Sequence, residues 1–356
     1  MGINHLNKFL RNNCPEIYEE INLTEYAFQK IAIDISLYLC KFKVVCGDRW
    51  LSAFLNMVTC LRKNEIHCIF IYDSGAPIEK QEERAERAAR RDKNESQVLE
   101  LEESLNKYNL IGEIDPILIE LSGKMNKKNN PRLLSANNVN NINIDMDEIE
   151  NKIIKMRRYI LNITSEDFIL TKELFTILNV PYYDAPLEAE TMCSDLCKRG
   201  LVDAVMSEDT DVLAYGSPIF LSKVDFTKCT AVRIIHSQML DALELNSLEF
   251  IDLCIMCGTD YNKNIPRIGP EKSYNLIKRH RNIEEIHKET SFDITILKHI
   301  RTRELFKDYE QFKINDIPYC GIPNFDKLKE FIFKNNMRID IDGIISAFIP
   351  NIIFEE

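Results

Sequence analysis

Apolar residues follow one another almost without interruption at four places in the chain, and each run ends close to an acidic residue. The runs are KIAID, CIFIYD, VPYYDA and DAVMSED, and the neighbouring acids are Asp34, Asp73, Glu188 and Asp209. Continuous apolar character is typical of strands that are buried on both faces of a sheet. We therefore predict four strands whose ends carry carboxylates.

Helical periodicity fills much of the sequence between these runs. It covers residues 48–63, 79–107, 147–161 and 167–178. Strands that alternate with helices predict an α/β fold with a parallel sheet flanked by helices. In such sheets, ligands bind outside the carboxyl ends of the strands. We therefore expect the acids to converge on one crevice.

Changes in composition divide the chain into four regions. Residues 109–150 are rich in Asn, Lys and Ser and have little to bury, so we predict a disordered or loosely packed insertion. After residue 230 the pattern becomes helical almost throughout. The predicted regions are 1–108, with an α/β pattern and a basic helix, the insertion 109–150, a second α/β region 151–240, and a helical region 241–356.

The bulk composition predicts a globular intracellular protein. The chain has 356 residues, 45% hydrophobic and 28% charged, which is enough for a large core. No stretch approaches the roughly 18 apolar residues of a membrane span, so no membrane is expected. A formal net charge of −11 argues against general nucleic-acid binding and leaves only local basic patches.

Eleven cysteines show no disulfide framework and fit a reducing compartment. The spacing of Cys193 with Cys197, and of Cys254 with Cys257, could suggest zinc. Neither pair has a second pair or a nearby His to complete four ligands. We predict buried thiols.

The acids form a set of the kind that binds hard metal ions. Glu188 and Glu190 are two positions apart, and so are Asp209 and Asp211, which is poor spacing for partners on a helix surface but suits a loop or a helix start around an ion. Oxygen-only ligands select Mg²⁺ or Mn²⁺, and two such ions can support phosphodiester hydrolysis. The alternative is that these acids are ordinary helix caps. The whole set is Asp34, Asp73, Glu188, Glu190, Asp209 and Asp211, with Asp260 as a seventh member.

A basic stripe follows the Asp73 strand. Lys80, Arg84, Arg87 and Arg91 recur at helical spacing and could grip phosphates. The alternative is a solvated helix in which Glu83 pairs with Arg87 and Glu86 with Arg90.

The segment GTDYNKNIPRIGPEKS reads as a turn that leads into a helix. Pro270 suits the first helical position, and Gly269 leaves backbone amides open for a phosphate, with Lys272 within reach. A purely structural helical hairpin is equally compatible with this segment.

Six segments occur in the order seen in structure-specific 5′ nucleases, and the chain most resembles the flap endonucleases. They are MGINHLNKFL, IAIDIS, FIYDSGAP, YYDAPLEAE, SEDTDVLAYG and GTDYNKNIPRIGPEKSYNLI. The resemblance covers residues 1–108 and about 147–340. It implies a PIN-like parallel sheet, a helical arch, and a C-terminal helix-two-turn-helix that holds duplex DNA through a monovalent cation such as K⁺.

The resemblance also implies roles for individual residues. Lys80 and Arg87 match the catalytic Lys and Arg of the arch, and Gly2 matches the glycine that begins the processed chain near the active site. Arg84, Arg91, Gly269 and Lys272 are predicted to contact DNA together with Gly2. The seven acids named above match the family's ligands for two Mg²⁺ ions, and Asp34, Asp73, Glu188 and Asp211 are counted among the catalytic residues.

Several positions depart from the flap-endonuclease pattern. Cys40 stands in register with an aromatic that stacks on the nucleotide at the cleavage position, while Tyr38 lies two residues earlier. Arg267 replaces the first glycine of the hairpin. The C-terminal FIPNIIFEE lacks the usual sliding-clamp peptide. The Ile-, Asn- and Lys-rich composition suggests a large DNA virus or a protist.

The predicted function is a Mg²⁺-dependent endonuclease that cuts 5′ flaps or branched DNA as a monomer, in a nucleus or at a cytoplasmic viral replication site. One alternative changes the substrate to that of a 5′ exonuclease, or of a gap, junction or excision-repair nuclease. Another is a non-catalytic scaffold that binds DNA for recombination.

Overall fold

The structure is a computed structural model that describes residues 2–129, 145–160, 163–307 and 312–348. The chain divides into two compact units. One contains Met1–Phe42, Asp48–Gln81 and Thr164–Glu356, and the other contains Lys43–Gly47 and Glu82–Ile163. These two units cut across the four predicted regions, because residues distant in sequence pack into the same core.

The first unit is built on a mixed sheet in the strand order β1-β7-β6-β5-β2-β3-β4. The four predicted strands are present and parallel: β2 (Lys30–Asp34), β3 (His67–Tyr72), β4 (Tyr182–Asp184) and β5 (Ala204–Met206). Three further strands extend one side: β1 (Glu19–Asn22), β6 (Ile219–Asp225) and β7 (Thr230–Ile235). Only β6 among them is parallel to its inner neighbour, and β7 is antiparallel to both β1 and β6.

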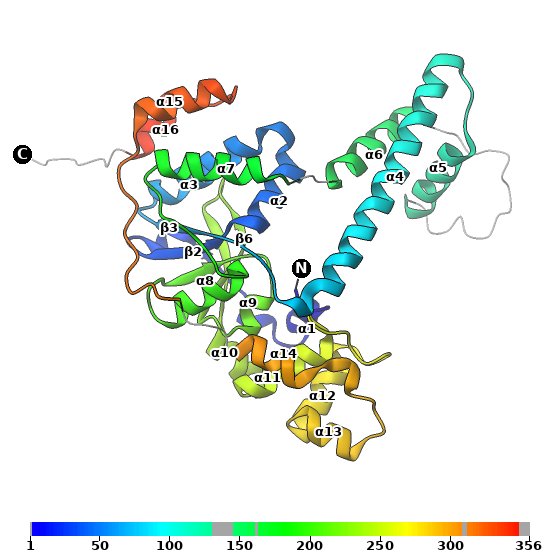
Figure 1. The fold of residues 1–356 in the computed structure, drawn as a ribbon, viewed down its shortest axis with the longest axis vertical. Coiled ribbons are helices and arrows are strands. Elements are labelled where there is room, and N and C mark those ends of the chain that lie inside the picture. Colours follow the sequence, from blue (N-terminus) through cyan, green and yellow to red (C-terminus); the bar gives the residue numbers. More distant parts are fainter. Residues whose placement is uncertain (1, 130–144, 161–162, 308–311, 349–356) are drawn as a thin grey trace, which may run out of the picture. The chain divides into compact units, whose positions relative to one another are not determined.

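Helices cover both faces of this sheet, as the continuous apolar runs predict. Helices α3 (Trp50–Lys63) and α7 (Ser165–Ile177) lie on one face, where Phe70 stacks on Phe175 with ring centroids 3.9 Å apart. Helix α8 (Ala189–Lys198) packs on β2, β3 and β5 from the other face (Figure 1). Its residues Met192 and Leu196 belong to the largest hydrophobic cluster.

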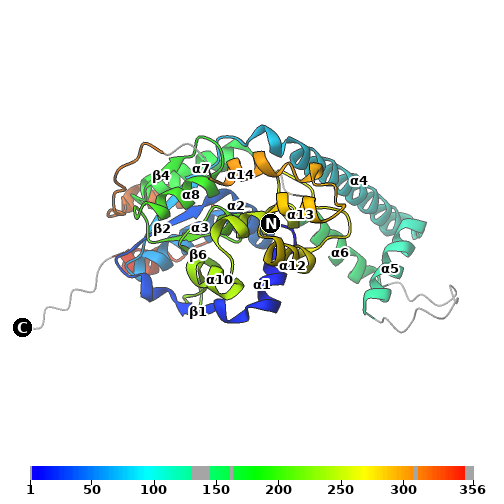
Figure 2. The same ribbon diagram turned by 90° about the horizontal axis from the view of Figure 1, so that it is seen from below.

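The remaining helices of this unit surround the sheet. They are α1 (Leu6–Asn13), α2 (Ile35–Cys46), α9 (Asp211–Ala214), α10 (His236–Leu243), α11 (Ser247–Cys257), α12 (Pro270–His280), α13 (Ile283–Glu289), α14 (His299–Lys307), α15 (Phe325–Lys334) and α16 (Ile341–Phe348). In Figure 2, α12 and α13 lie next to each other. Both helices follow the strands of the sheet in sequence. The helical C-terminal region is confirmed.

Helices α11 and α12 pack against each other and are joined by the predicted turn. Gly258 leaves α11 at a φ of +92°, and Arg267 also has a positive φ, of +66°. A positive φ favours glycine. The positive φ at Arg267 therefore fits the glycine that the resemblance leads us to expect at this position.

The second unit is helical. It contains α4 (Gln81–Ile111) beyond its first residue, α5 (Pro116–Asn129) and α6 (Met146–Tyr159). Leu118 and Leu121 of α5 pack with Leu101, Leu105 and Ile149 in a small hydrophobic cluster. Residues 116–129 of the insertion that is predicted to be disordered or loosely packed form a helix, because these leucines find apolar partners on α4 and α6. Residues 130–144 lie outside the described part.

No helix in the described residues is long and apolar enough to cross a membrane. All eleven cysteines are free, and the four that could suggest zinc are buried, as predicted.

Candidate active site

The predicted acids gather at the carboxyl edge of the central strands. Asp34 is the last residue of β2, Asp73 follows β3, and Asp209 follows β5, which are adjacent in the order β5-β2-β3. Because parallel strands end at the same edge, acids distant in sequence come together there. The other members lie at Glu188 and Glu190 at the start of α8, at Asp211 at the start of α9, and at Asp260 in the turn after α11.

Backbone amides fix several of these carboxylates. Asp73 accepts a hydrogen bond from the amide of Ala189, 2.7 Å away, which ties the end of β3 to the start of α8. Asp34 accepts from the amide of Ser36 at 2.9 Å, and Asp209 from that of Asp211 at 3.1 Å. The strand-end acids therefore also cap the chain locally, as the alternative interpretation expects, whereas Glu188, the N-cap residue of α8, makes no side-chain cap hydrogen bond.

Lys80 is the counter-ion of this cluster. It ends the short 3₁₀ turn η4 (Ile78–Lys80), and its ammonium pairs with Glu188 and with Asp260, the latter at 3.0 Å. Burial by itself would lower the pKa of Lys80, but the charges of Glu188, Glu190 and Asp260 outweigh this effect and raise that pKa. The lysine is therefore held in its charged form among the acids.

Burial and mutual repulsion raise the pKa of several acids. The pKa of Asp34 rises to about 8, mainly because its carboxyl is desolvated and secondly because the charge of Asp73 is nearby. Desolvation also raises the pKa values of Glu190, Asp209 and Asp211, and neighbouring acids add to the effect. Oxygen Oδ1 of Asp211 is buried without a hydrogen-bond partner among the described residues. Such a group is stabilised by a cation.

The donors fit a hard divalent ion in their chemistry, since all are carboxylate oxygens. Within the described ranges, however, no three His, Cys, Asp or Glu side chains already stand close enough together to hold a metal ion. Lys80 occupies the position between Glu188 and Asp260 instead. The side chains must therefore rearrange for a metal to bind.

Gly2 lies against the same acids. Its φ is +84°, and a Cβ added there would approach Oδ1 of Asp209 to 2.0 Å and Oδ1 of Asp211 to 2.9 Å. The next residue, Ile3, donates its amide to the hydroxyl of Thr210 at 3.2 Å. Only glycine fits at this position.

The basic stripe is divided between the two units. Lys80 belongs to the first unit and faces the acids, whereas Arg84, Arg87 and Arg91 are exposed residues of α4 in the second. Arg87 pairs with Glu83 at 2.7 Å and Arg90 with Glu86 at 3.3 Å, as the solvated-helix alternative expects. Lys80 therefore lies in the turn before α4, whereas the three arginines lie on the helix itself.

The start of α12 is open. Gly269 is the N-cap residue and Pro270 the first helical residue, as predicted, and a Cβ added at Gly269 would meet nothing within 4 Å. Lys272 is exposed, and its ammonium lies 3.5 Å from the carbonyl oxygen of Arg267.

Two tyrosines beside the acids were not predicted. Tyr261 donates its hydroxyl to Glu188 at 2.5 Å and also bonds the hydroxyl of Tyr215. The position of Tyr261 directly after Asp260 was the available signal, whereas nothing in the sequence linked Tyr215 to the acids. Tyr38 is fully buried, against Phe42 and Phe226, so it does not replace the aromatic that is missing at Cys40.

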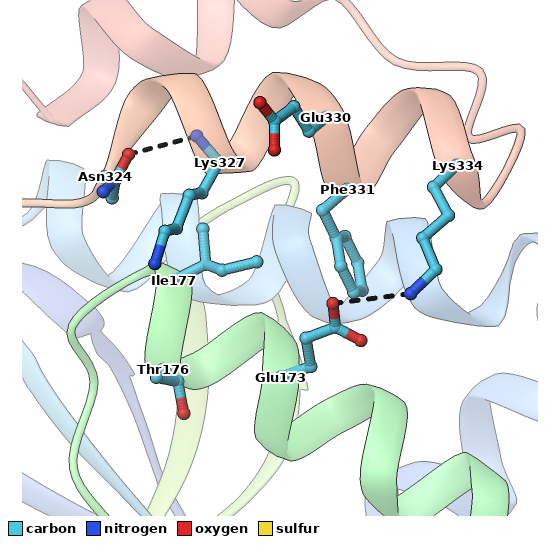
Figure 3. A pocket seen from close by; sticks show the side chains of 8 residues that line it. All are labelled: Glu173, Thr176, Ile177, Asn324, Lys327, Glu330, Phe331 and Lys334. Atoms are coloured by element: carbon cyan, nitrogen blue, oxygen red, sulfur yellow. Dashed lines mark hydrogen bonds and ion pairs between the residues drawn. The ribbon is translucent and has the colours of Figure 1, made fainter.

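This unit has several hollows. A cavity of about 250 Å³ lies beside Glu188 and is lined in part by Pro77, Leu187, Tyr261 and Arg301. A larger groove of about 640 Å³ runs between α7 and α15, where Lys334 pairs with Glu173 (Figure 3). None of the seven acids lines this groove, so it is not part of the candidate site.

Comparison with known proteins agrees with this geometry. The XPG N-terminal domain matches residues 1–94 and the XPG I-region matches residues 179–260. A protein of Invertebrate iridescent virus 6 named "Probable RAD2-like endonuclease" is 34% identical, over 98% of this chain and 92% of its own length. The chain belongs to the flap-endonuclease-like family of 5′ nucleases. It is accordingly a hydrolytic enzyme of the nuclease class, and the non-catalytic scaffold is the wrong alternative.

A more distant relative agrees with this family, and solved structures share the fold. Flap endonuclease 1 of Cryptosporidium parvum is 27% identical, over 94% of this chain and 67% of its own length. The catalytic core of Rad2 in complex with DNA substrate has a TM-score of 0.67 at 17% identity, covering 98% of this chain and all of that one. Flap endonuclease-1 from Methanococcus jannaschii has a TM-score of 0.60 at 20% identity, with 94% and 95% coverage. The predicted PIN-like α/β fold is confirmed.

Proposed function

We propose that this chain is a Mg²⁺-dependent endonuclease that cuts branched DNA, with 5′ flaps as the preferred substrate. The observation that carries the proposal is the meeting of seven acids from separate segments around Lys80 at one edge of the sheet. Burying so much negative charge is costly unless cations accompany it. Relatives named as flap endonucleases and RAD2-like endonucleases support the same reaction class.

Two divalent ions would be held by Asp34, Asp73, Glu188, Glu190, Asp209, Asp211 and Asp260. All donors are oxygens, so Mg²⁺ is preferred and Mn²⁺ can substitute. When bound, such ions activate water and neutralise charge that develops on the phosphate. Lys80 would leave Glu188 and Asp260 and, with Arg87, stabilise the scissile phosphate.

DNA would be held by its phosphates, which carry no sequence information, so its shape would decide specificity. The open start of α12 at Gly269, with Lys272 nearby, suits a duplex phosphate, and a K⁺ ion is proposed for the same turn. Gly2, Arg84 and Arg91 are the other proposed DNA contacts. The Rad2 core that shares this fold was determined with a DNA substrate.

One observation favours a second candidate within the same family. The aromatic expected to stack on the nucleotide at the cleavage position is absent, since Cys40 stands there and Tyr38 is buried. A weaker grip on that nucleotide would shift preference towards gapped, nicked or four-way DNA, or towards 5′ exonuclease action. A panel of these substrates distinguishes the candidates by relative single-turnover rates.

The remaining expectations also stay proposals. We infer a monomer that does not use the usual sliding-clamp peptide, working in a nucleus or at a cytoplasmic viral replication site. The relatives from two invertebrate iridescent viruses support the second location.

The test is cleavage of an end-labelled 5′ flap by Asp211→Asn, with and without Mg²⁺. We expect a fall in single-turnover rate of roughly 10²-fold or more, because the variant removes one buried metal donor. Asp225→Asn is the matched control, since Asp225 ends β6, where it accepts backbone hydrogen bonds in its own turn and pairs with Lys228. Equal cutting by Asp211→Asn and wild type would refute the proposal.

A further inference from the structure

Helix α14 is connected to its neighbours within the first unit by ion pairs and by an aromatic contact. Arg303 donates to both oxygens of Asp252, at 2.5 and 2.6 Å, and to both oxygens of Glu284, at 2.5 and 2.8 Å. On the same helix, Phe306 is buried against the rings of Tyr215 and Tyr261. The helix is therefore fixed both to α11 and α13 and to the tyrosines beside Glu188.

A second arginine of α14 reaches the turn that carries Lys80. Nε of Arg301 donates to Oε1 of Glu79 at 2.7 Å, and its Nη1 contacts Glu304 at 2.9 Å. The Glu79 side chain is only 17% exposed, and its other oxygen is buried without a hydrogen-bond partner in the described structure. The ion pair with Arg301 therefore holds Glu79 to α14.

Turn η4 is otherwise held by the ion pairs of Lys80 and by its own backbone hydrogen bonds. The amide of Lys80 donates to the carbonyl of Pro77 at 3.1 Å, and the loop before it is tied through Ser74 to Leu187 at 3.0 Å. Pro77 and Arg301 both line the cavity of about 250 Å³ beside Glu188, so the turn has space into which it can relax. A lysine side chain is flexible, so the position of its ammonium depends on where the backbone of the residue is held.

We propose that Arg301 is a positioning residue for Lys80: by holding Glu79, it fixes η4 so that the ammonium of Lys80 stays among the acids. The catalytic importance of Lys80 rests on the proposed function. The position of its ammonium among the acids does not depend on that function. The alternative role for Arg301, which is 55% exposed, is a direct contact with a DNA phosphate.

The first test measures the position of Lys80 without cleavage. Metal-free full-length protein is acetylated with an N-hydroxysuccinimide ester, and the modified Lys80 peptide is quantified by mass spectrometry. Arg301→Ala and Glu79→Gln should each raise the acetylation rate about threefold to fivefold, the scale of one half-exposed ion pair. Glu304→Gln is the control, because it breaks the other contact of Arg301, and it should leave the rate unchanged. Equal acetylation of Lys80 in Arg301→Ala and wild type overturns the proposal.

The second test uses single-turnover cleavage of a 5′ flap at saturating enzyme. Arg301→Ala, Glu79→Gln and the double variant should all lose about threefold to fivefold with unchanged DNA affinity. The exchanged pair Glu79→Arg with Arg301→Glu should recover most of the rate. In a Lys80→Ala background, Arg301→Ala should have no further effect.

The outcomes separate the two roles. If Arg301→Ala weakens DNA binding, keeps its full effect in the Lys80→Ala background and is not reproduced by Glu79→Gln, then Arg301 contacts DNA and the proposal is wrong. If Lys80→Ala cleaves like wild type, the proposed catalytic role of Lys80 fails, while the acetylation result still decides whether Arg301 positions it.

Discussion

At the scale of single residues, the site depends on a few residues that cannot be substituted without disturbing the acids. Lys80 gives the buried acids a positive partner where Glu188 and Asp260 approach each other. Gly2 gives them room, since even one extra carbon would collide with Asp209. Lys and Gly are common residue types. The importance of these two comes from their position in the fold, next to the acids.

Gly2→Ala tests the requirement for room. We expect at least about a tenfold loss of single-turnover cleavage, because the new Cβ must push aside the Asp209 and Asp211 oxygens that we propose as metal ligands. Gly200→Ala is the matched control, since Gly200 has a φ of +70° with nothing within 4 Å of the added Cβ. Both variants should lose about 1 kcal/mol in unfolding free energy for the positive φ, but only Gly2→Ala should lose cleavage. Equal activity of the two variants would contradict this reading of Gly2.

At the scale of elements, the carboxyl edge of the sheet concentrates charge because three adjacent strands end there. Strands β5, β2 and β3 deliver Asp209, Asp34 and Asp73, and the starts of α8 and α9 add three more acids. Parallel strands that are adjacent in a sheet end at the same edge, and this brings their terminal carboxylates together. The same arrangement makes the metal-free protein sensitive to pH.

The metal-free protein should lose stability as pH rises from about 4 to about 8. The pKa of Asp34 is raised to about 8 by burial and by Asp73, so the folded state keeps a proton that the unfolded chain releases near its ordinary pKa of about 3.9. Stability is then present below the unfolded pKa and is lost as pH passes through the folded one. Each such group contributes at most about 1.4 kcal/mol per pH unit.

Calorimetry in EDTA at pH 5.5 and pH 8 checks this pH dependence, and Mg²⁺ should raise the melting temperature more at pH 8, where fewer protons compete. Asp34→Asn serves as the comparison, because removing its titration should flatten the slope between the two pH values. A wild-type slope identical to that of Asp34→Asn would show that Asp34 is not the source.

At the scale of the whole molecule, two units have separate cores. The second unit holds Leu101, Leu105, Leu118 and Ile149 in a cluster of its own, apart from the large cluster beside the sheet. A unit with its own small core can open without unfolding its neighbour. The arginines proposed to help at the phosphate belong to this second unit.

Leu101→Ala should loosen the second unit alone. Leu101 is 1% exposed, and the truncation should cost that unit about 2–4 kcal/mol. Hydrogen exchange should accelerate in α4 and α6 while β3 stays protected. Leu99→Ala, on the same helix but at a residue that is 50% exposed, should change exchange little. Faster exchange in β3 with Leu101→Ala would show that the two cores unfold together.

The four inner strands and several helices were predictable because their signals are local. Continuous apolar runs marked β2, β3, β4 and β5, and periodicity marked α3, α4, α6 and α7. Strands β1, β6 and β7 were missed because edge strands of a mixed sheet carry shorter or mixed apolar patterns. Helix α5 was missed because its few leucines are significant only through their partners on α4 and α6.

The sequence by itself determined the family, the inner strands and the identity of the seven acids, because ordered motifs and local apolar patterns survive without knowledge of contacts. Only the tertiary structure decided that Lys80 pairs with Glu188, that Tyr261 and Tyr215 join the acids, and that Arg301 reaches Glu79. These contacts join residues far apart in sequence, and their energy depends on distances and burial that no local pattern encodes.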